Sequence, residues 1–164
     1  MRFVADAMVG TLAKWLRILG YDTYFAPELD DHQLVRLARA EGRVLLTRDR
    51  ELAERPGLKS LLLTSEDLET QIGQVLADLR LEPDRSFSRC PVCNGQLTEI
   101  TREEARERVP AYVARTHESF MACPVCLRVY WRGTHWEHMD EQLGHILKGN
   151  IPSETGQMPE INSS

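Results

Sequence analysis

Two short cysteine motifs constrain this chain more strongly than any other feature of its sequence. The segments Cys90-Pro-Val-Cys93 and Cys123-Pro-Val-Cys126 repeat one C-x-x-C pattern, and together they contain all four cysteines of the chain. Each C-x-x-C turn presents two thiolates, and zinc binds four such ligands in a tetrahedron. The sequence therefore predicts one zinc ion bound by Cys90, Cys93, Cys123 and Cys126.

The expected role of this zinc ion is structural. Four cysteine ligands leave no open coordination position for a reacting molecule. The residues around the motifs are too few to fold through apolar burial alone, so the metal would supply the missing stability. The alternative is that the cysteines form two disulfides or redox-active dithiols. We expect the chain in the cytoplasm, where reducing conditions disfavour disulfides, because its start lacks the apolar core of a signal peptide.

Apolar residues on both sides of the second cysteine motif predict a zinc ribbon. Phe120–Ala122 precedes the motif and Val129–Trp131 follows it, as the two strands of a hairpin would. Between the two motifs, Thr101–Glu104 has the sequence of a capping box and is expected to start a short helix. The cysteines therefore belong to a small module with its own secondary structure.

The first half of the chain alternates short apolar runs with helical patterns. Met8, Leu12 and Leu19, for example, have the spacing of one buried helix face. Strands that alternate with helices form right-handed βαβ units and a parallel sheet. We therefore expect an α/β fold, with a parallel sheet flanked by helices and followed by the small zinc-ribbon module. The expected strands lie at residues 2–6, 22–25, 44–47 and 60–63, and the expected helices at 7–19, 31–42, 50–55 and 67–79.

Composition completes the expected division of the chain. The segment that contains Pro83 is suited to a linker, and the last residues are rich in Pro, Gly, Ser and Asn with little to bury. The predicted divisions are an α/β domain at residues 1–80, a linker at 81–88, a zinc ribbon at 89–139 and a disordered tail at 140–164.

Several aspartates are expected at one edge of the sheet. Asp6 and Asp49 directly follow predicted strands, and Asp67 lies just past another; the pair Asp30-Asp31 begins a helix. The carboxyl ends of parallel strands meet at one edge, where ligands bind. Neighbouring carboxylates repel unless a cation lies between them, so this edge predicts a Mg²⁺ or Mn²⁺ site with Asp6 and Asp49 as ligands. The predicted catalytic acids are Asp6, Asp30, Asp31, Asp49 and Asp67.

Helix capping is the alternative explanation for most of these acids. Asp49 and one residue of the Asp30-Asp31 pair stand where an N-cap is expected. Asp67 suits the first turn of a helix, where a negative charge complements the helix dipole. Asp6 differs from the others, because we expect no capping role for a carboxylate that ends a buried strand.

Basic residues near the acids are predicted to contact phosphates. Lys14 and Arg17 share one face of the first helix, and Arg48 adjoins Asp49. Such residues would hold the phosphates on either side of a cleaved bond. The alternative is that they form an ordinary solvated surface. The net charge of −5 does not decide whether the chain binds nucleic acid, because local charge matters more than the total.

The predicted zinc ribbon combines arginines with aromatic residues, a pairing that suits single-stranded RNA. We expect His135 and Trp136 to contact RNA. The alternative is that the aromatic residues pack the ribbon, and we favour packing for either Trp131 or Trp136. The reason is that side chains along a strand alternate between its two faces.

Several of these segments resemble the Mut-seven C-terminal RNase family. The similar segments are residues 4–23, residues 45–52, the two C-P-V-C motifs and residues 130–136, so that the resemblance spans roughly residues 1–139. The resemblance implies a PIN-like fold with a zinc ribbon and a predicted ribonuclease activity. It also implies that Asp6, Asp49 and one of Asp30 and Asp31 match the acidic positions of PIN-like nucleases, with Asp67 as a candidate for the fourth.

The residues and the resemblance together predict a divalent-metal-dependent ribonuclease. Its cofactors would be structural zinc and catalytic Mg²⁺ or Mn²⁺, and its substrate would be RNA. We expect no membrane association, because no apolar run is long enough to span a bilayer. The ribbon could also bind a protein or a ribosome. The alternative hypothesis is a non-catalytic module that binds RNA, the ribosome or a protein.

Overall fold

The structure of the chain is a computed structural model that describes residues 1–83 and 87–147. Within the last helix, only the backbone is described for Thr134, His135 and Leu147. The chain divides into two compact units, Met1–Asn94 and Gly95–Ser164, and each unit is described by itself.

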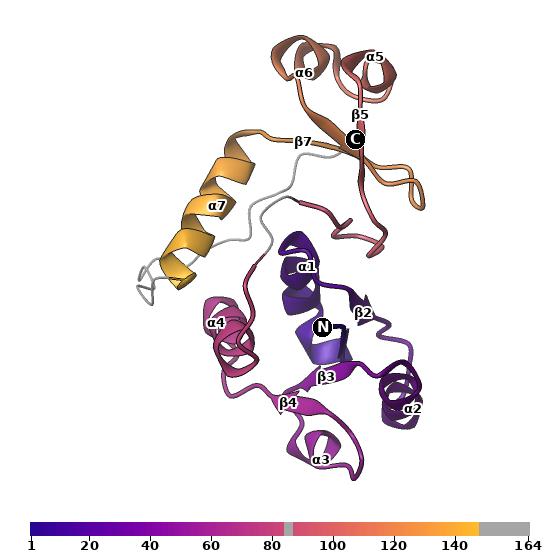
Figure 1. Cartoon of the computed structure of the whole chain (residues 1–164), viewed down its shortest axis with the longest axis vertical. Coiled ribbons are helices and arrows are strands. Elements are labelled where there is room, and N and C mark those ends of the chain that lie inside the picture. Colours follow the sequence, from indigo (N-terminus) through magenta and orange to yellow (C-terminus); the bar gives the residue numbers. More distant parts are fainter. Residues whose placement is uncertain (84–86, 148–164) are drawn as a thin grey trace. The chain divides into compact units, whose positions relative to one another are not determined.

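A four-stranded parallel sheet forms the centre of the first unit (Figure 1). The strand order is β2-β1-β3-β4, and all three pairings are parallel. Both central strands are buried along their whole length, which explains why their sequences are continuous apolar runs. The strands are β1 (Phe3–Ala5), β2 (Thr23–Phe25), β3 (Val44–Thr47) and β4 (Ser60–Leu62).

Helices cover both faces of this sheet. On one face, α2 and α3 pack on β1 and β3 through a core formed by Val4, Leu34, Val35, Ala38, Leu45 and Leu52. On the other face α1 and α4 lie side by side (Figure 1). A short 3-10 helix, η1 (Ala7–Val9), connects β1 to the first α-helix. The α-helices are α1 (Gly10–Ile18), α2 (Asp31–Glu41), α3 (Arg50–Ala53) and α4 (Leu68–Asp78).

The second unit contains a three-stranded antiparallel sheet in the order β5-β6-β7. Two short helices separate β5 from β6, and a core that includes Val113, Phe120 and Trp131 holds these elements together. The elements are β5 (Thr98–Ile100), α5 (Arg102–Ala105), α6 (Ala111–Thr116), β6 (Phe120–Ala122), β7 (Val129–Trp131) and α7 (Thr134–Leu147).

The predicted fold class is confirmed. A parallel sheet flanked by helices is followed by a module with the predicted hairpin, and a cluster of cysteines is compatible with a zinc ribbon. The short helix expected after Thr101 is also present, and the Thr101 side chain caps it by accepting a hydrogen bond from the Glu104 N–H. Among the described residues, no helix is long and apolar enough to cross a membrane.

The last helix differs from expectation. Residues from Asp140 were expected to be disordered, whereas α7 continues to Leu147. Met139, Leu143 and Ile146 recur at helical spacing and are buried. The polar composition of the following segment hid this short apolar stripe when the whole stretch was considered together. Residues 148–164 of the predicted tail lie outside the described part of the chain.

Candidate metal centre and acidic edge

The four cysteines form a cluster that fits one zinc ion. Their sulfur atoms all lie within 4.8 Å of one another. A tetrahedral zinc site with Zn–S bonds of about 2.3 Å separates its sulfurs by about 3.8 Å, so only small adjustments are needed. Two independent disulfides would not require all four sulfurs to gather in one place. The donor set and its geometry therefore match a closed, structural zinc site.

The two cysteine turns have the same backbone form, and we call each a knuckle. The first knuckle is Cys90–Asn94 and the second is Cys123–Leu127. In each, the N–H of the last residue donates to the carbonyl of the first cysteine at 2.9 Å. The last residue also has a left-handed backbone, with φ of 70° at Asn94 and 67° at Leu127. Asn tolerates this conformation well, whereas Leu adopts it only rarely.

At the carboxyl edge of the parallel sheet, the ends of β1 and β3 bring Asp6 close to the backbone of Asp49. Asp6 follows β1 and is 6% exposed. Its Oδ1 accepts a hydrogen bond from the Met8 N–H at 2.9 Å, and its Oδ2 accepts one from the Thr47 hydroxyl. The Thr47 hydroxyl in turn accepts from the Asp49 N–H at 2.9 Å. Thr47 at the end of β3 therefore connects Asp6 to Asp49 at the carboxyl edge of the sheet.

Helix capping is a property that most of the predicted acids share. Asp30 accepts from the Gln33 N–H at 2.8 Å within a capping box, and Asp49 accepts from the Leu52 N–H at 3.2 Å. Asp6 also caps a helix, contrary to expectation, because the chain enters η1 directly after β1. A carboxylate has about four lone-pair positions, so one such bond leaves capacity for a metal ion.

Asp67 and Asp31 lie in exposed positions. Asp67 caps α4 and accepts hydrogen bonds from the Thr70 hydroxyl at 2.7 Å and the Thr70 N–H at 2.8 Å. These bonds hold the pKa of Asp67 below its usual value. Asp31 occupies the first turn of α2. Within residues 1–83 and 87–147, the four cysteines are the group whose ligand atoms lie close enough together to hold a metal ion. No three acids in these residues bring their carboxylate oxygens that close together.

The predicted phosphate-binding residues have different surroundings. Lys14 is half-buried on α1, and Arg48 forms an ion pair with Glu66 at 2.9 Å. Arg17 is only 7% exposed. Its guanidinium donates to the Thr23 carbonyl at 2.9 Å and to two carbonyls of the first knuckle, those of Pro91 at 3.0 Å and Val92 at 3.1 Å. The structure therefore gives Arg17 a role at the cysteine motif instead of at the acidic edge.

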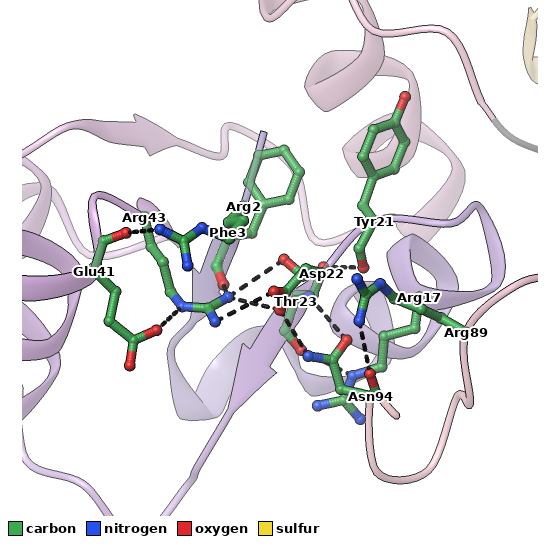
Figure 2. A network of polar contacts seen from close by, with 10 residues as sticks. All are labelled: Arg2, Phe3, Arg17, Tyr21, Asp22, Thr23, Glu41, Arg43, Arg89 and Asn94. Carbon is green, nitrogen blue, oxygen red and sulfur yellow. Dashed lines mark hydrogen bonds and ion pairs between the residues drawn. The ribbon is translucent and has the colours of Figure 1, made fainter. Parts of the chain in front are cut away.

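A polar network that was not predicted from the sequence surrounds the first knuckle (Figure 2). The Asn94 side chain accepts from the Thr23 N–H at 3.0 Å and donates to Asp22 at 2.7 Å, and Arg43 donates to the same Asp22 carboxylate at 2.8 Å. Burial alone would raise the pKa of Asp22, but these hydrogen bonds and the charge of Arg43 outweigh it, so the pKa is lowered. The sequence offered one sign of this network. The first C-P-V-C motif is followed by the polar residue Asn94, whereas the second is followed by Leu127.

In the second unit, the aromatic residues divide between core and surface. Trp131 is buried in the core cluster, which confirms that one of the two tryptophans packs the ribbon. Trp136 is half-buried, and the Arg132 guanidinium lies 5.1 Å from its ring centroid. Such a cation–π pair presents a flat, positively charged surface. The side chain of His135 lies outside the described part of the chain.

These features define a class of protein, namely a small α/β protein with a parallel sheet and paired cysteine knuckles. The family model described as Mut7-C RNAse domain matches residues 1–143, so the chain belongs to that family. The family suggests a ribonuclease-type function, with RNA as the substrate. Comparison with curated proteins and with solved structures found no match.

Proposed function

We propose that the protein is a Mg²⁺- or Mn²⁺-dependent ribonuclease that hydrolyses RNA phosphodiester bonds at the carboxyl edge of β1 and β3. Membership of the Mut7-C RNAse domain family supports the reaction class. The single structural observation that carries the proposal is the hydrogen-bonded link from the Asp6 carboxylate through the Thr47 hydroxyl to the backbone N–H of Asp49.

Asp6 and Asp49 are the residues that would hold the ion. Carboxylate oxygens are the ligands that Mg²⁺ prefers, and Mg²⁺ usually completes its shell with water and substrate phosphates. The ion would activate water and stabilise the leaving oxygen. Asp6 is buried and fixed by two hydrogen bonds, whereas Asp49 is exposed and accessible to solvent and substrate. The additional acids Asp30, Asp31 and Asp67 remain candidates for a supporting role.

Basic residues of the first unit would position the RNA substrate. Lys14 and Arg48 would contact the phosphates on either side of the cleaved bond. Arg17 is excluded from this role in the proposal, because its guanidinium is buried and bonded to three carbonyls. The Arg132–Trp136 pair of the ribbon would stack on RNA bases, with His135 as a neighbour on α7.

A cleavage assay on mixed RNAs tests the proposal. Wild-type protein should cleave with Mn²⁺ or Mg²⁺, and Asp6→Asn or Asp49→Asn should lower the rate by about 10²-fold or more, as loss of an electrostatic catalytic group does. Glu51→Gln is the matched control, because Glu51 is an exposed acid in the first turn of the helix that Asp49 caps. The zinc content of each sample separates loss of the catalytic ion from loss of the zinc at the cysteines.

A second candidate function is a non-catalytic RNA-binding or ribosome-binding module. The observation that favours it is the capping role of Asp6, Asp30, Asp49 and Asp67, together with the absence of three convergent acids among the described residues. The double variant Asp6→Asn with Asp49→Asn separates the two. A ribonuclease loses cleavage and keeps RNA binding, whereas a binding module cleaves nothing in either form.

A further inference from the structure

Helix α1 connects the two edges of the parallel sheet in the first unit. Because β1 and β2 are parallel, α1 must begin at the carboxyl edge of the sheet and return to the amino edge. Gly10 starts the helix beside the turn that Asp6 caps, and Arg17 lies in its last turn. Arg17 is therefore close to the start of β2, where the first knuckle lies against the sheet.

The contacts of Arg17 are specific to the backbone of that knuckle. A buried guanidinium is stable only when its donors are satisfied. Arg17 satisfies them with the Thr23 carbonyl at the start of β2 and with the Pro91 and Val92 carbonyls between the two cysteines. The same turn that presents the thiolates of Cys90 and Cys93 is thus bonded to the end of α1.

Asn94 makes a second connection from the other end of the knuckle. Its backbone closes the turn, and its side-chain amide bonds the Thr23 N–H and the Asp22 carboxylate (Figure 2). The Arg89 guanidinium supports the turn by donating to the Asn94 carbonyl at 2.9 Å. The middle and the last residue of the first knuckle are therefore bonded to α1 and to the start of β2.

Charge supplies a reason for an arginine at this position. A zinc ion with four thiolates carries a net charge of about −2, since each thiolate contributes one negative charge. The positive charge of Arg17 interacts favourably with Cys90 and Cys93. Lysine would provide the charge, but only arginine has a planar fork of donors that can reach three carbonyls.

We propose that Arg17 and Asn94 are positioning residues that couple zinc binding at the four cysteines to the order of α1 and β2. Anything that holds the first knuckle in its bound form raises the affinity for zinc. By thermodynamic reciprocity, bound zinc then stabilises the hydrogen bonds that Arg17 and Asn94 make with α1 and β2. This coupling between the cysteine site and α1 and β2 does not depend on the proposed ribonuclease activity.

The two knuckles provide a matched pair of variants that tests this coupling. Glycine adopts the left-handed backbone of Asn94 and Leu127 without strain, so Asn94→Gly keeps the turn and removes only the amide bonds. In the full-length protein, competition with a chromophoric zinc chelator should show about tenfold weaker zinc binding for Asn94→Gly, as expected for the loss of two hydrogen bonds. Leu127→Gly, the control, should bind zinc as tightly as the wild type.

Hydrogen exchange of individual amides provides a second readout. The Thr23 N–H is bonded to the Asn94 side chain, so it should be protected in the zinc-loaded wild type and exchange faster in zinc-loaded Asn94→Gly. The Leu45 N–H, which donates to the Lys59 carbonyl within the sheet, is the internal control and should not change. Equal zinc affinities for the two glycine variants, or equal Thr23 protection in wild type and Asn94→Gly, would overturn the proposal. If the zinc-free protein unfolds, the comparison of the two zinc-loaded proteins still decides.

Discussion

The two cysteine knuckles contain the same four residues, and they share the same turn and the same backbone hydrogen bond, but their surroundings differ. The first knuckle ends in Asn94, whose amide is bonded to β2 and to Asp22. The second ends in Leu127, whose side chain is 70% exposed and whose carbonyl accepts from Arg108 at 2.8 Å. The residue after the second cysteine, more than the motif itself, determines whether a knuckle is bonded to neighbouring elements through a side chain.

Two single variants, each lacking one cysteine of a different knuckle, should have the largest effect on zinc binding and stability. Cys90→Ser and Cys123→Ser should both lose zinc, because three thiolates do not hold a structural ion of this kind, whose binding contributes about 10–16 kcal/mol in small zinc modules. The second unit should then lose its near-UV circular dichroism. The proposed coupling predicts that both variants also weaken the hydrogen bonds of Arg17 and Asn94 to the first knuckle and β2, because both variants lose the zinc ion. Metal analysis and thermal unfolding of both variants check these outcomes.

Replacement of Arg17 should have the next largest effect on stability. Arg17→Met keeps the length of the side chain and leaves three carbonyls without their donor, which should lower the free energy of unfolding by about 2–4 kcal/mol. Lys14→Met on the same helix should change the free energy of unfolding by no more than about 0.5 kcal/mol, because Lys14 is only half-buried. Urea unfolding of the zinc-loaded proteins measures both. Similar losses for the two variants would contradict the role of Arg17.

The pH dependence of stability should report on Asp22. Its pKa in the folded protein is lowered from 3.8, so its stabilising contribution is present above that value and is lost as the pH falls through the lower, folded-state pKa. Asp22→Asn should therefore be less stable than the wild type by about 1–2 kcal/mol at pH 7. The gap between the two proteins should narrow below about pH 4. Zinc loss at acid pH affects both proteins alike, so a gap that stays constant with pH would exclude this explanation.

Leu127→Gly should have the smallest effect and the opposite sign. A leucine at φ 67° is strained, and glycine relieves that strain at some cost in chain entropy. The expected result is a gain of about 0.5 kcal/mol in the free energy of unfolding. Asn94→Gly should instead destabilise the protein, although its backbone is equally left-handed. Thermal unfolding of the two zinc-loaded variants makes this comparison, and a loss of stability in both would indicate that the backbone conformation alone matters.

Much of this structure follows from local patterns in the sequence. The apolar runs of β1 and β3 are buried on both faces, and acids such as Asp30 and Asp49 occupy the capping positions that their places in the chain indicate. The cysteine cluster was predictable because the spacing of its four residues is a local feature that repeats. Each of these predictions depends on residues that are close in sequence or on a motif with a fixed chemistry.

Contacts between distant side chains were not predictable in the same way. Helical spacing correctly predicted that Arg17 shares a helix with Lys14, but spacing does not show at which edge of the sheet a residue lies. Arg17 is about 10 Å along the helix axis from Gly10, which takes it away from the acidic edge. The partners of Arg17 lie in Pro91 and Val92, far along the chain, and the sequence contains no pattern that pairs them.

The anchoring of the first knuckle has a practical consequence for dividing the chain. A fragment that stops at residue 80, where the helices and strands of the α/β domain end, would remove every acceptor of Arg17 except the Thr23 carbonyl and would leave the Thr23 N–H without the Asn94 amide. A laboratory that wishes to express the parallel sheet by itself should therefore retain the chain through Asn94. Such a fragment would contain the first cysteine pair, Cys90 and Cys93, because their turn is bonded to α1 and β2.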